Sequence, residues 1–427
     1  MRVNSQETDR SLEALWRIES PKLIAHLARL THDVGRAEEL AQDAFVAALA
    51  QWPREGMPRN PGAWLETAAK RRALDHLRRE HTLDRKTTEL ARDLAERDVA
   101  RGDGAAQFET VDEEAGERID DDILRLMFVA CHPVLSPQAR VALTLRLLGG
   151  LTTAEIARAF LVPEATVAQR IVRAKRTLSE ARVPFEVPTG NDRKQRLASV
   201  LEAIYLIFNE GYAATAGDDV LRPQLVEDAL RLGRVLATLV PDESEVHGLV
   251  ALMELHASRV PTRTGPAGEP ILLVDQDRGR WDHLLIGRGL GALARAERLG
   301  ALGPYALQAA IAACHARATA PERTDWPRIV ALYDALAQLA PSPVVELNRA
   351  VAVGMAFGPA AGLALVDPLL AEPSLKGYHL LPSVRADLLH KLGRRAEALT
   401  EFERAASLAN NARDRAFLLE RAAACRS

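Results

Sequence analysis

The stretch LTTAEIARAFLVPEATVAQRIVRAKR, residues 151–176, predicts two helices joined by a tight turn. Thr152 and Glu155 stand three positions apart, the spacing of a capping box, so the first helix is expected to begin there. Pro163 suits the first position of the second helix, because its missing N–H would be unpaired there anyway. Glu164 favours the positive end of that helix. Both helix starts are therefore specified locally.

The second of these helices is amphipathic. Its apolar positions recur at helical spacing, and its basic positions lie mostly off that stripe. The apolar positions are Val167, Ile171, Ala174 and Leu178, and the basic ones are Arg170, Arg173, Lys175 and Arg176. A recognition helix needs this layout, because the buried stripe fixes it while the arginines reach phosphates and guanine edges. A solvated amphipathic helix without a ligand has the same pattern, so both readings stay open.

The composition predicts an all-α protein of several domains. At 427 residues the chain exceeds the size of a single core, and alanine, leucine and arginine dominate while aromatic residues make up 4%. The net charge of −3 argues against a uniformly basic DNA binder, so charge has to be judged domain by domain. The three distant cysteines build neither a disulfide framework nor a four-ligand zinc site. With no signal region or spanning apolar run, we expect a cytoplasmic protein without a membrane contact.

Changes in pattern along the chain predict four parts. Residues 1–83 form a helical domain, 123–184 form a second helical domain that contains the helix-turn-helix, and 190–427 are helix after helix. Between them, residues 84–122 read as an acidic linker, mobile or loosely held, with 14 acidic residues against 6 basic ones. The negative charge of the chain is therefore concentrated in the linker, and the helix-turn-helix is locally basic.

The C-terminal part shows a weak internal repeat. In GRRAEALTEFERAASL, residues 393–408, Ala398, Phe402 and Ala405 stand where a tetratricopeptide second helix packs small and aromatic side chains. Tyr333 lies 69 positions before Phe402, close to two repeats of about 34 residues. We therefore expect a tetratricopeptide-like helical-repeat domain, with a plain helical bundle as the alternative.

Two further motifs precede the helix-turn-helix in a fixed order. DVGRAEELAQDAFVAAL (33–49) and NPGAWLETAAKRRALDHLRRE (60–80) come first, and LSPQARVALTLRLLGGLTTAEIARAFLVPEATVAQRIVRAKRTL (135–178) follows the acidic linker. Together they resemble the extracytoplasmic-function sigma factors of bacterial RNA polymerase, a group of the sigma-70 family. The resemblance covers roughly residues 11–182, and the C-terminal part resembles the subgroup with a tetratricopeptide-like extension.

The resemblance implies that the first motif docks on the clamp of the largest polymerase subunit. An exposed acidic and polar ridge would suit a basic partner there, whereas without that context a solvated helix face is the simpler interpretation. The positions carried over as core-polymerase-binding are Asp33, Glu38, Glu39, Leu40, Gln42, Asp43 and Phe45.

The second motif, by the same resemblance, opens the minus-ten promoter element and holds the unpaired strand. Single-strand capture needs positive charge for the backbone and a surface for the bases. The residues implied are Trp64, Lys70, Arg71, Arg72, Arg78 and Arg79, with Trp64 expected mainly as a core anchor. Glu66, Thr67, Ala68 and Arg71 depart from the usual family residues, which bears on the promoter preference and not on the role.

The third motif is implied to read the minus-thirty-five element as duplex DNA. Its candidate contacts are Pro163, Glu164, Thr166, Val167, Arg170, Arg173, Lys175 and Arg176. Leu161 and Ala165 replace two glycines that are common in the family, so we expect a turn without a left-handed residue, or a slightly longer one. The family linker runs toward the RNA path of the polymerase, where an acidic segment can imitate nucleic acid.

The C-terminal part also contains two polar islands, LIFNEGYAA (206–214) and VDQDRGRWDHLLI (274–286). A set of capping and salt-bridge residues explains them most simply, and an interdomain or ligand contact is the sharper alternative. The residues concerned are Asn209, Glu210, Tyr212, Asp275, Asp277, Arg278, Trp281 and Asp282. The pairs Cys131–His132 and Cys314–His315 lack ligand partners at regular spacing, so no metal site is predicted.

The sequence thus predicts a sigma factor that binds core RNA polymerase and promoter DNA, both duplex and opened strand, with a regulatory C-terminal domain that binds an unknown protein or ligand. No phosphate loop, nucleophile elbow or metal-ligand motif is present, so we expect no enzyme activity and no cofactor. A polymerase-independent DNA-binding regulator with a helical-repeat sensor, and a helical-repeat interaction scaffold, are the alternatives.

Overall fold

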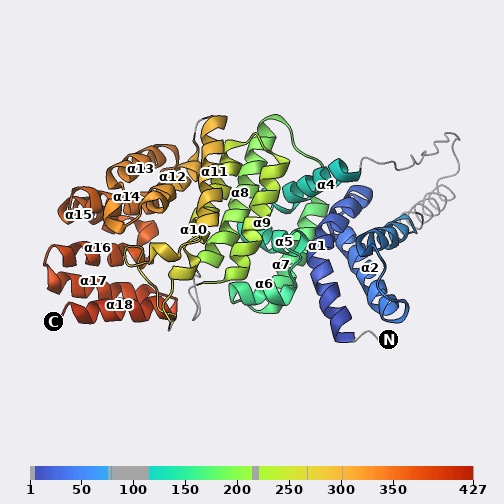
Figure 1. Cartoon of the computed structure of the whole chain (residues 1–427), viewed down its shortest axis with the longest axis horizontal. Helices are drawn as coiled ribbons and strands as arrows, with labels where there is room; N and C mark the ends of the chain where they lie inside the picture. Colours follow the sequence, from blue (N-terminus) through green and yellow to red (C-terminus); the bar gives the residue numbers. More distant parts are fainter. Residues whose placement is uncertain are drawn as a thin grey trace, which may run out of the picture. The chain divides into compact units, whose positions relative to one another are not determined.

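The computed structural model describes residues 5–75, 78, 115–213, 221–266, 268–300 and 302–426. Throughout these ranges the regular elements are helices, which confirms the all-α prediction (Figure 1). The chain divides into two compact units, Met1–Arg158 with Val162–Ala203, and Ala159–Leu161 with Ile204–Ser427. The division falls within one long helix, whereas the sequence pattern placed the boundary ahead of residue 190.

The first unit packs its helices around α1. Its elements are α1 (Ser5–Thr31), α2 (Val34–Glu55), a helix over residues 61–75, α4 (Ala115–Ala130), α5 (Pro137–Leu147), α6 (Thr153–Phe160), α7 (Glu164–Glu180) and the first half of α8 (Gly190–Tyr212). Helix α1 contacts α2, α4 and α5, and α7 contacts both α5 and α2. The helix-turn-helix and the first helical domain therefore share one packed unit.

The expected linker ends earlier than predicted. Residues 84–114 lie outside the described residues. Helix α4 begins at Ala115 and not near Ile123, so the last acidic residues of the expected linker are helical. Asp122 is 2% exposed and accepts hydrogen bonds from Arg29 at 2.9 Å and Arg125 at 2.6 Å. These two cations stabilise a buried carboxylate and tie α4 to α1, which a charge count along the chain does not reveal.

The helix-turn-helix begins as predicted. The Thr152 N–H donates to Glu155 Oε2 at 2.7 Å, and the Glu155 N–H donates to Thr152 Oγ1 at 3.1 Å, which confirms the capping box. The turn differs from its prediction, because Leu161 itself is left-handed, with φ of 50°. With no glycine at this position, Leu161 itself adopts the strained conformation.

The second unit is a succession of helices. They are α9 (Pro223–Leu239), α10 (Ser244–Ala257), α11 (His283–Leu299), α12 (Pro304–Arg317), α13 (Trp326–Leu339), α14 (Pro343–Phe357), α15 (Pro359–Val366), α16 (Leu380–Lys391), α17 (Arg395–Leu408) and α18 (Ala412–Ala424). Five 3-10 turns join them: η1 (Val260–Thr262), η2 (Arg278–Arg280), η3 (Pro321–Arg323), η4 (Asp367–Ala371) and η5 (Pro373–Leu375). From α12 to α18 each helix packs on the next one along the chain.

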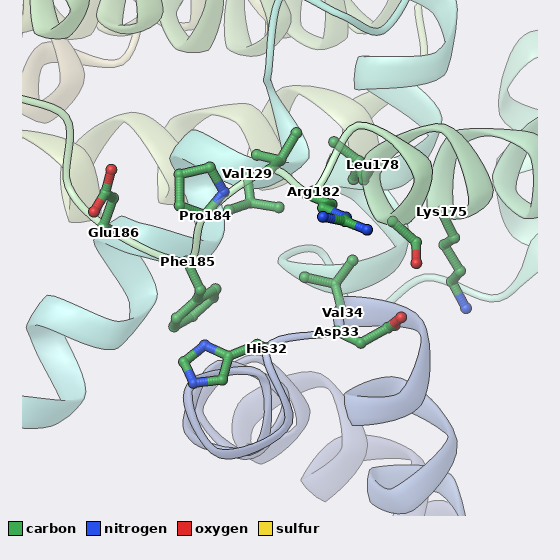
Figure 2. Close-up of a pocket in the computed structure, with 12 residues that line it drawn as sticks. His32, Asp33, Val34, Val129, Lys175, Leu178, Arg182, Pro184, Phe185 and Glu186 are labelled. Carbon is green, nitrogen blue, oxygen red and sulfur yellow. The ribbon is translucent and has the colours of Figure 1, made fainter. Parts of the chain in front are cut away.

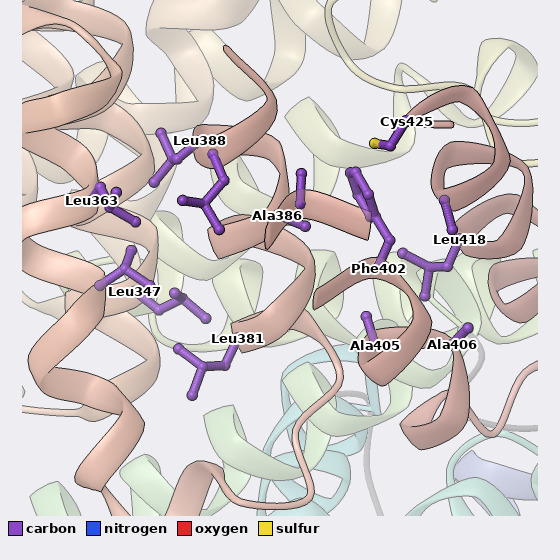
Figure 3. Packing of buried hydrophobic residues seen from close by; sticks show 14 of the residues in the cluster. Leu347, Leu363, Leu381, Ala386, Leu388, Phe402, Ala405, Ala406, Leu418 and Cys425 are labelled. Carbon is purple, nitrogen blue, oxygen red and sulfur yellow. The ribbon is translucent and has the colours of Figure 1, made fainter. Parts of the chain in front are cut away.

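The last five helices share one hydrophobic core (Figure 3). Ala398, Phe402 and Ala405 are all buried in it, as the repeat pattern requires, and Phe402 is 1% exposed. Leu347 of α14 and Leu418 of α18 belong to the same core. The assignment of these helices to tetratricopeptide repeats stays a prediction. None of the helices in the described part of the chain is both long and apolar enough to cross a bilayer.

Candidate nucleic-acid and polymerase interface

Helix α7 presents a basic face beside a buried stripe. Its four apolar positions are all buried, which confirms the predicted stripe. Arg173 is exposed and Arg170 is half-buried, and neither forms an ion pair within the described residues. Together with Thr166 they line an open hollow of about 370 Å³. This face is therefore available to an anionic partner.

The other residues predicted to contact duplex DNA divide into available and occupied ones. Glu164 and Thr166 are exposed at the start of α7, and Pro163 is exposed at its N-cap position. Arg176 is exposed and donates to Glu180 at 2.6 Å. Val167 is fully buried, so it contributes packing and cannot reach a base.

Lys175 and Glu38 form the most consequential ion pair of the first unit. Glu38 of α2 is 2% exposed and pairs with Lys175 of α7, while Arg146 of α5 donates to its Oε1 atom at 2.5 Å. Burial alone would raise the pKa of Glu38, but the two cations outweigh it and the pKa is lowered. A predicted polymerase contact and a predicted DNA contact are therefore joined to each other in this structure.

The remaining polymerase-docking candidates are only partly exposed, contrary to the expected ridge. Glu39 and Asp43 are exposed, whereas Leu40 and Phe45 are each 6% exposed. Phe45 packs edge-on against Trp16, with ring centroids 4.9 Å apart. The others are polar groups with local partners: Asp33 caps α2 by accepting from the N–H groups of Gly35 and Arg36, and Gln42 donates to Glu38.

A cavity of about 410 Å³ adjoins the Glu38 ion pair (Figure 2). Asp33 and Val34 at the start of α2 line one side, and Lys175 of α7 and Arg182, which follows α7, line the other. Phe185 reaches toward His32 across one end of the cavity. The cavity therefore leaves a gap in the packing between α2 and α7, next to the ion pair of Glu38 and Lys175.

The residues predicted to hold the opened strand lie on or near the helix over 61–75. Trp64 is half-buried, and its ring meets that of the buried Trp52 edge-on, with centroids 5.4 Å apart. The basic candidates differ in exposure: Arg71 and Arg78 are exposed, Lys70 and Arg72 are half-buried, and Arg79 lies outside the described residues. This supplies a partly open aromatic ring with cations on the same helix.

The polar islands of the second unit separate into two groups. The first group has local roles, because Asp277 caps η2, Asp282 caps α11, and Glu210 pairs with Arg222. Asn209 and Asp275 are exposed.

The second group, Tyr212, Arg278 and Trp281, gathers with side chains that the sequence pattern missed. These are His256, Arg259, Arg263 and His315. Two of these arginines stand in RVPTR (259–263), and this pair of cations is the sequence signal that could have indicated the group. In the part of the chain that the structure describes, no group of three or more His, Cys, Asp or Glu side chains is placed to bind a metal.

The first unit has the features of a two-part helical DNA-binding protein, because a helix-turn-helix with an exposed basic face packs with a second helical part. Comparison with known families gives the same class, since residues 15–82 match sigma-70 region 2 and residues 125–178 match sigma-70 region 4. Residues 196–297 match a family of unknown function, DUF6596. The chain belongs to the extracytoplasmic-function group of the sigma-70 family, and it is a sigma factor, a DNA-binding transcription initiation factor.

Relatives extend over different parts of the chain. A Rhizobium meliloti (strain 1021) protein named Uncharacterized protein R00370 is 44% identical over 402 residues, which are 93% of this chain and 92% of that protein. The probable ECF RNA polymerase sigma factor SigI of Mycobacterium tuberculosis (strain H37Rv) is 28% identical over 182 residues, 43% of this chain and 59% of that protein. SigC of the CDC 1551 strain, an ECF RNA polymerase sigma factor, is 27% identical over 169 residues, 40% of this chain and 82% of that protein. No solved structure matches the chain.

Proposed function

We propose that this sigma factor binds core RNA polymerase through α2, directs it to promoters through α7 and the helix over 61–75, and is regulated by its C-terminal unit. The observation that carries the proposal is the order of regions 2 and 4 in one chain, with two arginines on α7 that form no ion pair within the described residues. A polymerase-independent regulator or a scaffold would need no sigma-70 region 2, so the match of residues 15–82 to that region favours the sigma factor over both alternatives.

The promoter contacts are divided between duplex and single strand. Arg170 and Arg173 supply two charges for phosphates or guanine edges, and Thr166 lies in the same hollow. Trp64, with Lys70 and Arg71 farther along its helix, offers a stacking edge and charge to an unpaired strand. Neither set has to bind tightly alone, because the polymerase would hold both on one promoter.

The arrangement of α2 and α7 is, in this proposal, a closed form of the factor. While Glu38 and Lys175 pair with each other, Glu38 is not free to contact the polymerase and Lys175 is not free to contact DNA. Separation of α2 from α7 breaks the ion pair between the buried Glu38 carboxylate and Lys175, which is unfavourable unless new partners replace it. We therefore expect the free factor to bind promoter DNA poorly until polymerase separates the two regions.

A pull-down with core polymerase followed by run-off transcription tests the proposal. We expect the full-length chain to be retained by core polymerase and to start transcripts at discrete promoters in a promoter library. Retention without transcripts would leave only a polymerase-binding scaffold. Promoter binding without retention would favour the polymerase-independent regulator, and the proposal would then be wrong.

A further inference from the structure

Three arginines of the second unit surround two aromatic rings. Arg263 Cζ lies 3.8 Å from the centroid of the Tyr212 ring, and Arg259 Cζ lies 5.8 Å from the same centroid. Arg259 Cζ also lies 5.9 Å from the Trp281 ring, and Arg278 Cζ lies 5.1 Å from it. Arg259 and Arg263 flank the turn η1, and Arg278 lies in η2, so three positive charges converge on one patch, which we call the arginine cluster.

None of the three arginines forms an ion pair within the described residues. Arg278 donates to the carbonyl oxygens of His315 at 2.8 Å and Ala318 at 2.7 Å, and Arg259 donates to the Tyr212 hydroxyl at 2.6 Å. All three side chains are half-buried. Cation–aromatic contacts stabilise such charges only modestly and do not neutralise them.

Within the described residues, no acidic side chain forms an ion pair with the cluster. Asp277 and Asp282 are engaged in capping helices, and Glu210 pairs with Arg222. Glu322 and Asp414 act on the cluster only electrostatically, without a hydrogen bond to it. Burial raises the pKa of Asp414, and His379 and Arg263 offset this only in part.

Two histidines beside the cluster are held neutral. Burial lowers the pKa of His256 well below its usual value, and Arg259 and Arg263 lower it further. Burial likewise lowers the pKa of His315 to about 4, with Arg259 and Arg278 contributing. The site therefore keeps its charge on the guanidinium groups across the physiological pH range.

Several buried polar atoms of this patch have no hydrogen-bond partner among the residues that the structure describes. The donors are Arg263 Nε, Arg278 Nε and Trp281 Nε1, and Trp281 is 3% exposed. Nδ1 of His315, beside Arg259 and Arg278, is also unpartnered. Unsatisfied buried donors are unfavourable, and their concentration around cations that form no ion pair within the described residues indicates a site that would donate hydrogen bonds to the oxygens of an anion.

We propose that the arginine cluster is a binding site for a small anion that carries a phosphate group. Three guanidinium groups exceed the charge of one carboxylate and match a multiply charged phosphate, whose oxygens accept from arginine forks. Cations already cover the faces of Tyr212 and Trp281, so the ligand is recognised by charge and not by stacking. The site lies wholly in the C-terminal unit and goes beyond the proposed promoter function.

Calorimetric titration of the full-length protein with pyrophosphate, inorganic phosphate and glycerol phosphate tests this site, with sodium chloride at matched ionic strength as the reference. We expect saturable binding of at least one phosphate compound. Arg259→Gln and Arg263→Gln should each weaken it by about tenfold or more, because each removes a charge-assisted contact. The exposed Arg288→Gln, in the same unit, should leave it unchanged.

The three titrants separate inorganic from organic sources of the same group. Binding of pyrophosphate or phosphate alone identifies an inorganic anion, and tighter binding of glycerol phosphate identifies a phosphorylated metabolite. Absence of saturable binding to all three in the wild-type protein overturns the proposal without recourse to a variant. Equal affinity in wild type and in correctly folded Arg259→Gln and Arg263→Gln, checked by circular dichroism, overturns it as well.

Discussion

Leu161 is a residue whose backbone conformation opposes its side chain. Its φ of 50° costs a β-carbon-bearing residue about 1–2 kcal/mol, and its side chain is 53% exposed, so little packing offsets the strain. We expect Leu161→Gly to raise the free energy of unfolding by about 0.5–1 kcal/mol in urea titrations, part of the relief being lost to the flexibility of glycine. Leu161→Ala, which keeps the β-carbon, should give no such gain, and an equal gain would refute the strain argument.

Glu38 makes the first unit sensitive to acid. Its pKa is lowered in the fold, so its contribution to stability is full above its unfolded pKa, about 4.5, and is lost as the pH falls through the lower folded value. We expect Glu38→Gln to lower the free energy of unfolding at pH 7 by about 3 kcal/mol, because it leaves Arg146 and Lys175 facing a neutral amide.

The variant should also flatten the pH dependence of unfolding below pH 4.5. Glu39→Gln is the matched control, since the exposed Glu39 pairs only with Arg36 and should cost about 0–1 kcal/mol. Equal losses in the two variants would show that the buried pair does not hold α2 to α7.

At the scale of elements, α7 is the helix on which the promoter proposal depends most. We expect the double substitution Arg170→Ala and Arg173→Ala to weaken promoter binding by the polymerase holoenzyme by about tenfold or more. The slope of log affinity against log salt should fall by about 2, because two phosphate contacts are lost. Filter binding across a salt series measures both.

The charge-matched control is Arg288→Ala with Arg317→Ala, two exposed positions outside the first unit. If both double variants lose the same affinity, general charge and not the face of α7 governs binding.

Local sequence patterns predicted the helices well, but they predicted the contacts between helices poorly. The buried stripe of α7 and the Thr152 capping box follow from spacing within one or two helical turns, and both were predicted from the sequence. Glu38 was predicted to be exposed, because its partners Arg146 and Lys175 lie more than a hundred residues along the chain. The arginine cluster escaped prediction because its partners lie on other helices, Tyr212 on α8 and His315 on α12, which local spacing does not bring together.

For the whole molecule, the position of the unit boundary inside α8 has a testable consequence. Arg196 is 8% exposed, with its Cζ 5.8 Å from the centroid of the Phe128 ring, and Glu202 accepts from Arg140 at 2.6 Å. A chain that ends at Thr189 loses both contacts, whereas one that ends at Ala203 keeps them. We expect the shorter chain to be less stable by about 2 kcal/mol in urea unfolding, and equal stability would place the boundary ahead of α8.

The chain that ends at Ala203 is therefore the proper test of regulation by the C-terminal unit. It keeps regions 2 and 4 and the contacts of Arg196 and Glu202, and it lacks the arginine cluster and the helices that follow. If the C-terminal unit regulates the factor, run-off transcription with the short chain will differ from that of the full-length chain at equal occupancy of polymerase. A phosphate compound that binds the full-length chain should then alter only full-length transcription, because its site is absent from the short one. Identical transcript yields from both chains, with and without the compound, would refute regulation while leaving the binding site itself intact.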